Sequence, residues 1–153
     1  MKNTRLTSIL TSSLVASALA IGSLASTQFA SAQSPTTLAE VTIPFDFQTP
    51  SQILPAGKYR VVRESSNLLL LRGPNSKGGF VITHDAMRRQ APTHGAIVFD
   101  RYGDKYYLHQ VWTAGQSTGL ECMKSRAEKA SMVAMNNEAP TAVELALNSV
   151  PQQ

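Results

Sequence analysis

The sequence has a single cysteine, Cys122, among its 153 residues. One thiol cannot form an intramolecular disulfide, so a domain built from this chain depends on its hydrophobic core in any redox compartment. Cys122 follows Glu121, whose negative charge raises the pKa of a neighbouring thiol. We therefore expect a structural or incidental cysteine rather than a catalytic nucleophile.

The sequence also lacks a strong excess of either charge. It has 14 Lys and Arg residues against 10 Asp and Glu residues, an excess of four. Lys2 and Arg5 lie in the first few residues, and their removal would leave an excess of two. Proteins that bind nucleic acid concentrate basic residues on one face, so we expect no nucleic-acid partner.

Long hydrophobic runs are missing except near the N-terminus, where no charged residue occurs between Leu6 and Ile21. A basic start, an apolar stretch and then the A-x-A pattern of Ala30-Ser31-Ala32 are typical of a secretory signal peptide. The sequence therefore predicts a signal peptide over residues 1–32 and a processed chain that begins at Gln33.

A permanent membrane anchor is disfavoured, because serine, threonine and glycine dilute the apolar stretch and no stop-transfer charges follow it. The cleavage region has no cysteine to which a lipid could be attached, and no Arg-Arg pair precedes the apolar stretch. We expect a periplasmic or extracellular bacterial protein with no stable membrane span after processing.

The processed chain has the length of one ordinary domain. We expect residues 33–40 to be a flexible leader and residues 41–135 to form a single β-rich domain with a short C-terminal helix. Residues 136–153 contain two prolines and many polar residues, so we expect a frayed or disordered tail, with at most a weak helical turn over 143–147.

Alternating apolar and polar residues over 41–47 predict a half-buried strand, and Pro44 places it at a sheet edge or at a bulge. Other strands are expected over 58–63, 68–71 and 80–83, with a long loop over 84–95.

Residues 96–102 and 105–112 form the clearest strand pair, because Gly103-Asp104 suits a type II′ hairpin turn. Strands at this spacing with no helix between them indicate an antiparallel meander closed into a small barrel or a sandwich.

Residues 119–135 prefer helix, and Ser125 and Glu128 match a capping box. The apolar side of this helix would consist mostly of Ala127, Ala130 and Ala134, which bury little area, so we expect loose docking.

Several segments have distinctive sequences: Ile43-Pro44-Phe45-Asp46-Phe47, Leu54-Pro55-Ala56-Gly57-Lys58-Tyr59, 101–108, Val111-Trp112 and Ser125-Arg126-Ala127-Glu128. In these the chain resembles a family of small exported bacterial β-rich proteins that has no assigned activity. The resemblance covers most of the predicted domain but not the tail. It implies export and a β fold, and it implies no catalytic residue.

The predicted hairpin has two faces. The expected core face contains Ile97, Phe99, Arg101, Tyr106, Leu108, Gln110 and Trp112, and the expected solvent face contains Val98, Asp100, Tyr102, Lys105, Tyr107, His109 and Val111. The second face would expose two tyrosines beside a charged turn, a surface suited to stacking against a sugar or a peptide. Tyr102, Lys105, Tyr107 and His109 are therefore the candidate binding residues.

Other chemistry has weaker support. His84, His94 and His109 with Asp85 and Asp100 lack the close spacing of a metal site, so no metal and no cofactor is predicted. Arg88 and Arg89, with Arg72 and Lys77, are basic residues that a solvated loop explains as well as a patch for anionic envelope polymers or lipid head groups. We identify no nucleophile placed beside a base, so no residue is predicted to be catalytic.

We therefore expect an exported, non-enzymatic binding or structural module of the cell envelope, with a glycan or a protein as its partner. A small exported hydrolase with a site between loop 84–95 and hairpin 96–112 is the main alternative, and an assembly unit that pairs through the Pro44 edge strand is another. The sequence assigns neither a ligand nor an oligomeric state.

Overall fold

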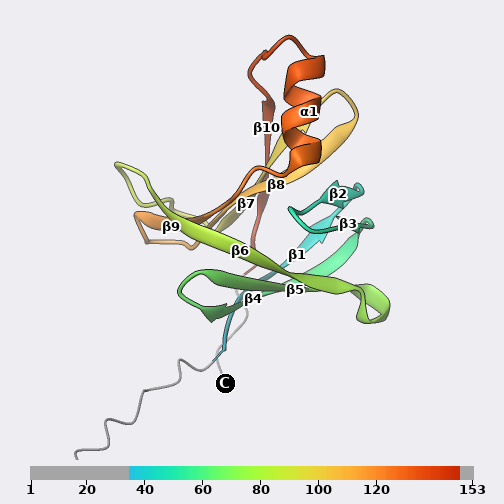
Figure 1. Ribbon diagram of the computed structural model, residues 1–153. Helices are drawn as coiled ribbons and strands as arrows, with labels where there is room; N and C mark the ends of the chain where they lie inside the picture. Colours follow the sequence, from blue (N-terminus) through green and yellow to red (C-terminus); the bar gives the residue numbers. More distant parts are fainter. Residues whose placement is uncertain (1–34, 149–153) are drawn as a thin grey trace, which may run out of the picture. The chain divides into compact units, whose positions relative to one another are not determined.

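The computed structural model describes residues 35–148, so the predicted signal peptide and the last five residues of the predicted tail lie outside it. The described residues form ten strands, one α-helix and one short 3₁₀ helix (Figure 1). Their bounds are β1 Thr36–Ile43, β2 Phe47–Gln48, β3 Ile53–Leu54, β4 Gly57–Ser65, β5 Leu68–Arg72, η1 Pro74–Ser76, β6 Gly78–Met87, β7 Ala96–Tyr102, β8 Lys105–Trp112, β9 Thr118–Cys122, α1 Arg126–Ala134 and β10 Thr141–Ala146.

The expected mainly β fold is confirmed. The strands form one mixed sheet in the order β1-β4-β5-β6-β9-β8-β2-β3, with β7 pairing β8 and β10 pairing β7. Strand β6 connects two parts of the sheet, because Gly78 to Ile82 pair with β5 and Thr83 to Met87 pair with β9. The sheet is not closed, so of the two architectures that the sequence left open, a sandwich describes the fold better than a barrel.

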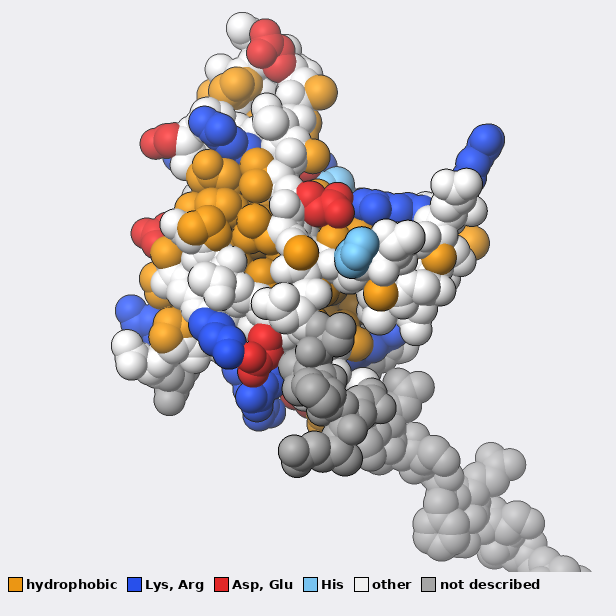
Figure 2. All heavy atoms as spheres, turned by 180° about the vertical axis from the view of Figure 1, so that it is seen from behind, with side chains coloured by type: hydrophobic (Ala, Val, Ile, Leu, Met, Phe, Trp, Pro, Cys, Tyr) orange, Lys and Arg blue, Asp and Glu red, His pale blue; other side chains and the backbone are white. Residues whose placement is uncertain are grey.

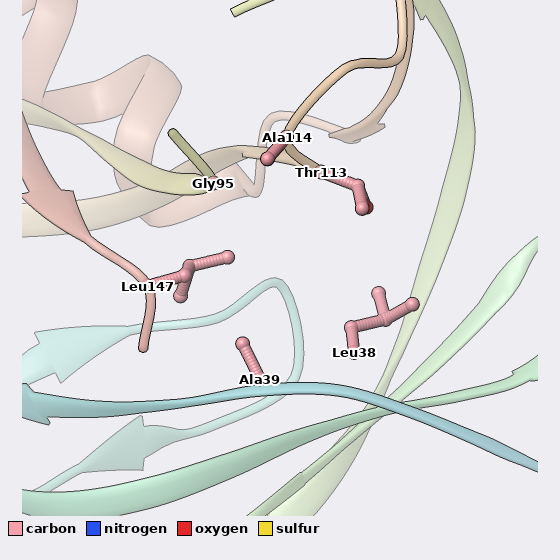
Figure 3. Close-up of a pocket in the computed structure, with 6 residues that line it drawn as sticks. All are labelled: Leu38, Ala39, Gly95, Thr113, Ala114 and Leu147. Carbon is pink, nitrogen blue, oxygen red and sulfur yellow. The ribbon is translucent and has the colours of Figure 1, made fainter. Parts of the chain in front are cut away.

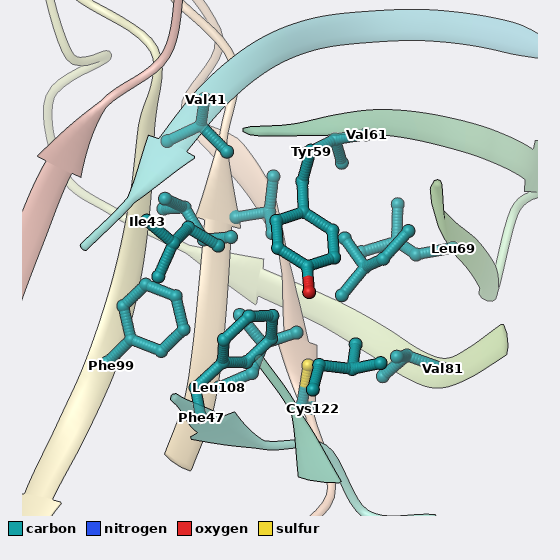
Figure 4. Packing of buried hydrophobic residues seen from close by; sticks show 14 of the residues in the cluster. Val41, Ile43, Phe47, Tyr59, Val61, Leu69, Val81, Phe99, Leu108 and Cys122 are labelled. Atoms are coloured by element: carbon teal, nitrogen blue, oxygen red, sulfur yellow. The ribbon is translucent and has the colours of Figure 1, made fainter. Parts of the chain in front are cut away.

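The core lies between the two parts of this folded sheet (Figure 4). It contains aromatic and branched side chains from strands far apart in sequence: Val41, Ile43, Phe47, Leu54, Tyr59, Val61, Leu69, Leu71, Val81, Ile97, Phe99, Leu108, Val111, Leu120 and Cys122. Phe47 makes edge-to-face contacts with both Tyr59 and Phe99 at ring distances of 5.3 Å. These contacts hold the short strand β2 beside β8, and the two strands pair in parallel.

The predicted hairpin is confirmed. Strands β7 and β8 have the expected bounds, and Gly103 has a φ of +63°, as a type II′ turn requires at its first central position. The register also agrees, with Tyr102 opposite Lys105 and Phe99 opposite Leu108.

On β7 the predicted core residues Ile97 and Phe99 both lie in the core, but on β8 the predicted faces hold only from the turn to Leu108. The register shifts between Val98 and Phe99, so His109 is an extra residue on β8 and forms a β-bulge. The bulge reverses the faces beyond it, which places Val111 in the main core and turns Trp112 towards the opposite side. The prediction that Trp112 shares a core face with Leu108 and that Val111 faces solvent is therefore wrong.

The predicted leader and tail are also wrong in part, because both supply strands. β1 begins at Thr36 rather than at residue 41 and ends at Ile43, and the chain bends at Phe45 before β2 begins. Val143 and Leu145 alternate on β10 and lie opposite Phe99 and Ile97 of β7. This alternation of inward apolar residues favours a strand over the weak helical turn and the frayed tail that we expected.

Two other boundaries differ from the prediction. Strand β6 extends to Met87, so the expected loop over 84–95 is shortened to residues 88–95. Residues Thr118–Cys122 form β9 rather than the start of a helix, since they pair with both β6 and β8. Pairing on two sides overrides their intrinsic helix preference.

Helix α1 begins after Ser125, whose side chain accepts a hydrogen bond from the Glu128 N–H at 3.0 Å, as the capping box predicts. The predicted contact side is wrong, because Ala127, Ala130 and Ala134 are exposed and Glu128 is the buried residue of the helix. Its side chain binds Lys124. The helix therefore docks through polar groups.

No helix among residues 35–148 has the length and hydrophobicity needed to cross a bilayer.

Candidate functional site

The predicted aromatic surface on the hairpin is covered by helix α1. Tyr102 and Tyr107 are only 3% and 2% exposed, and their rings meet edge to face at 5.8 Å. The Tyr107 hydroxyl lies 2.8 Å from Ser131 Oγ and donates to the carbonyl oxygen of Ala127 at 3.3 Å. The expectation of a solvent-facing tyrosine pair is therefore wrong, because the hairpin is packed on both sides.

The four predicted binding residues do not form a common surface. Lys105 is exposed at the hairpin turn, whereas His109 is half-buried in the bulge in the middle of β8. Because both tyrosines are buried, neither has an exposed ring face on which a sugar could stack.

A network of charged groups lies where α1 meets the sheet. Asp100 is buried, and its two carboxylate oxygens lie 3.0 Å from His109 Nδ1 and 2.7 Å from Lys124 Nζ. Lys124 also donates to the buried carboxylate of Glu128 at 2.6 Å. One lysine thus bridges two buried carboxylates, one on β7 and one on α1, and His109 contacts the first of them as well.

The pKa values in the network follow from these contacts. Burial alone would raise the pKa of Asp100, but hydrogen bonds from His109 and Lys124 outweigh it and lower this pKa. The hydrogen bond to Asp100 raises the pKa of His109 against the opposing effect of burial. Burial would lower the pKa of Lys124, yet its bonds to Asp100 and Glu128 raise it above the usual value.

The pair formed by Asp100 and His109 has the geometry of an oriented base, but it is not completed as a nucleophilic site. His109 Nε2 faces Glu121 at 3.7 Å, and no hydroxyl or thiol among the described residues forms a hydrogen bond with this ring. Because a covalent mechanism needs a nucleophile beside the base, the network is suited to fastening α1 to the sheet.

Sequence reasoning overlooked one motif that bears on the hydrolase alternative. Gly115 to Gly119 read G-x-S-x-G around Ser117. In hydrolases this motif forms a sharp turn between a strand and a helix. Here it connects strand β8 to strand β9, and Ser117 is exposed. The motif therefore occurs in the wrong structural context for a nucleophile elbow.

The histidines that we weighed as metal ligands lie in two places. His84 and His109 lie on either side of Glu121, each 3.7 Å from its Oε1 atom. His94 instead contacts its neighbour, with Nδ1 2.9 Å from the Thr93 hydroxyl. No group of three or more potential ligands is positioned to hold a metal ion anywhere in residues 35–148.

Cys122 is part of the core, 3% exposed, as a structural cysteine should be. Burial, with smaller contributions from Glu128 and Glu121, raises the pKa of its thiol to about 12. Such a thiol is protonated and shielded from reagents near neutral pH.

The four basic residues considered from sequence do not form one patch. The Arg88 guanidinium lies 4.1 Å from the ring centre of Trp112, a cation–π contact, and is half-buried there. Arg72 and Lys77 lie instead at the end of the hairpin formed by β5 and β6.

The outer edge of β10 is a different kind of feature. The bond from the Leu147 N–H to the Gly95 carbonyl fixes the register, so the backbone groups of odd-numbered residues point towards β7. Those of Ala142, Glu144 and Ala146 therefore point away from β7, and among the described residues β10 pairs with no strand other than β7. We call these three residues and their outward backbone groups the β10 edge.

The β10 edge is closed at only one end. Glu40 of β1 and Asn148 exchange two backbone hydrogen bonds of 3.0 and 2.9 Å. The strands do not pair beyond that bridge, although the same register would place Thr42 opposite Ala146. A small cavity of about 170 Å³ lies at the closed end, lined by Leu38, Ala39, Gly95, Thr113, Ala114 and Leu147 (Figure 3).

Half-buried apolar side chains accompany the open part of this edge. Val143 and Leu145 point inward from β10 and pack against the core without being fully covered. Phe45 is also half-buried; it stacks on Tyr106 at 3.8 Å and meets Phe99, the cross-strand partner of Val143, edge to face. A broad group of hydrophobic side chains is visible on the rear face of the molecule (Figure 2). Free backbone groups thus occur next to uncovered apolar area.

Comparison with protein-family models, with curated proteins and with solved structures finds no match for this chain.

Proposed function

We propose that this chain is a non-enzymatic binding module of the cell envelope that, after export, takes up an extended segment of another protein along the β10 edge. The observation that supports this proposal most directly is the set of outward backbone groups at Ala142, Glu144 and Ala146. Outward backbone groups at every second residue match the hydrogen-bonding pattern of an added strand.

The side chains around the edge define the partner. Residues of an added strand that point towards the core would cover Val143, Leu145 and Phe45, so apolar residues are preferred at every second position. The intervening residues would lie beside exposed Ala142 and Glu144, so a basic residue next to Glu144 is favoured. The proposed partner is a protein segment with alternating apolar and polar residues rather than a glycan.

The test uses a proline that removes one outward N–H. Glu144→Pro deletes the central donor of the β10 edge, while the bonds to β7 are made by the odd-numbered residues and remain. The probe is a fluorescent peptide of alternating valine and threonine with lysine at each end, and binding is followed by fluorescence anisotropy. We expect Glu144→Pro to weaken binding by about tenfold or more.

Glu144→Ala is the matched control, because it removes the same side chain and keeps the N–H; it should bind within about threefold of the original chain. A peptide methylated at alternate backbone nitrogens should not bind. Undiminished binding by a folded Glu144→Pro variant, or no binding of the probe at all, would contradict the proposal.

A further inference from the structure

Strands β5 and β6 present apolar side chains on the side that faces away from the core. Leu68 lies opposite Ile82 and Leu70 opposite Phe80, whereas the intervening Leu69, Leu71 and Val81 are buried. Phe80 and Ile82 are 57% and 63% exposed, and both leucines are half-buried. We call Leu68, Leu70, Phe80 and Ile82 the β5–β6 apolar face. Helix α1 lies beside β7 and β8, away from this hairpin (Figure 1).

Two basic residues lie at one end of this face. Arg72 ends β5 opposite Gly78, and Lys77 precedes β6 in a loop held by a 2.7 Å bond from the Gly73 N–H to the Lys77 carbonyl. A cavity of about 390 Å³ opens at this end, and its lining includes Arg72 and Lys77 together with Leu70 and Phe80. The cavity therefore has apolar walls and two cationic side chains.

The charges around the face favour an anionic partner. Arg60 lies opposite Arg72 in the β4–β5 ladder, and Lys58 lies two residues before it. Glu40 binds both Lys58 and Arg60, and Glu64 lies 3.7 Å from Arg72. Lys77 has no ion pair within the described residues. Four basic residues therefore border the face against two acidic ones.

We infer that the β5–β6 apolar face docks on an anionic lipid bilayer surface. Phe80 and Ile82 enter the boundary between head groups and acyl chains, where an exposed apolar side chain gains burial. Arg72 and Lys77 contact lipid phosphates at the cavity, since basic side chains near an anionic leaflet gain favourable energy. A bilayer accommodates this shallow face because it needs no complementary shape.

This inference does not depend on the proposed strand addition, because the β5–β6 apolar face and the β10 edge share no residue and no strand.

The test places a probe on the face itself. Ile82→Cys can be labelled selectively with an environment-sensitive NBD fluorophore, because Cys122 is buried and has a pKa of about 12. With phosphatidylglycerol vesicles we expect a blue shift and an emission gain of at least about twofold, and with phosphatidylcholine vesicles we expect little change. Ala146→Cys, an exposed position on β10, is the labelled control and should not respond.

A charge variant then tests the cavity. Replacing Arg72 and Lys77 by glutamine in the labelled Ile82→Cys chain should weaken partitioning into phosphatidylglycerol vesicles by about thirtyfold. The matched control replaces the exposed Arg89 and Lys105 by glutamine and should change partitioning by less than about threefold. Thermal melts check that each variant folds.

Three outcomes would overturn the inference: an equal response to neutral vesicles, a response at residue 146 as large as that at residue 82, or partitioning that is unaffected by the loss of Arg72 and Lys77. Attachment through another part of the chain does not imitate the expected result, because the fluorophore reports only the environment of residue 82.

Discussion

At the scale of single residues, the polar groups between α1 and the sheet distinguish this molecule from a plain β sandwich. Asp100 and Glu128 are buried carboxylates that share Lys124, and His109 bonds the other oxygen of Asp100. Removing one partner of a buried charged group leaves the other uncompensated, which costs more than the pair itself contributes. These residues therefore fix the position of the helix more than they add to net stability.

His109 should make the stability of the protein depend on pH. Its pKa lies above the usual 6.5 in the folded chain, so its contribution is complete below about pH 6.5 and is lost as the pH rises through the folded value. The pKa of Asp100 lies below 3.8, so its contribution is complete above that pH and is lost as the pH falls through the lowered value. We therefore expect the free energy of unfolding from urea titrations to fall as the pH rises above about 6.5.

His109→Gln should reduce this fall, whereas His94→Gln, at an exposed loop position hydrogen-bonded only to its neighbour, should retain it. Parallel pH profiles for the original chain and His109→Gln would show that the bond to Asp100 does not control the dependence.

Cys122 should behave as a core residue in a substitution test. Cys122→Ser places a hydroxyl at a site that is 3% exposed, so we expect a loss of about 1–3 kcal/mol in the free energy of unfolding. Cys122→Ala, which buries no hydroxyl, separates the polar effect from the lost volume. The native thiol should resist iodoacetamide near neutral pH and react in urea; fast labelling of the folded chain would contradict its burial.

At the scale of elements, β10 changes the interpretation of the C-terminal region. It pairs with β7 over six residues and places Val143 and Leu145 against the core. Without β10, the opposite edge of β7 and part of the core would be exposed to water. The strand is thus part of the fold and also provides the edge proposed for binding.

A chain that ends after Asn137 should be strongly destabilised, because it lacks β10 and the bridge between Glu40 and Asn148. Loss of two or more half-buried aliphatic side chains from a core costs several kcal/mol, so we expect a lowered or undetectable thermal transition. Thr141→Ser, at an exposed position of the same strand, is a mild control. An unchanged melting temperature of the shortened chain would mean that β10 does not support the core.

At the scale of the whole molecule, the two proposed surfaces are both compatible with an exported envelope protein. The β10 edge would bind an extended protein segment, and the β5–β6 apolar face would bind an anionic bilayer. Together they would attach a protein partner to a membrane surface.

Export itself is predicted from residues 1–32, which lie outside the described part of the chain. We expect expression in a bacterial host to yield a protein that begins at Gln33, because Ala30 and Ala32 occupy the two small-residue positions before the cleavage site. Intact-mass measurement of the exported fraction checks this. A product that retains residues 1–32 and fractionates with membranes would contradict the prediction of a soluble exported protein.

The sequence by itself determined the local features of this protein. Glycine at position 103 specified the hairpin turn and the register of β7 and β8 near that turn, and Ser125 specified where α1 begins. These depend on contacts within a few residues, so pattern and propensity predict them.

Only the tertiary structure decided which surfaces are covered. The bulge at His109 reversed the faces of β8 beyond it. Helix α1 buried Tyr102 and Tyr107 through a hydroxyl contact and a network of ion pairs, and hydrophobic periodicity in the sequence does not predict such polar contacts. The tail became strand β10 because β7 offered it a partner. Long-range strand pairing and polar docking bring together residues that are far apart in the chain. Prediction from one local segment at a time therefore does not detect these contacts.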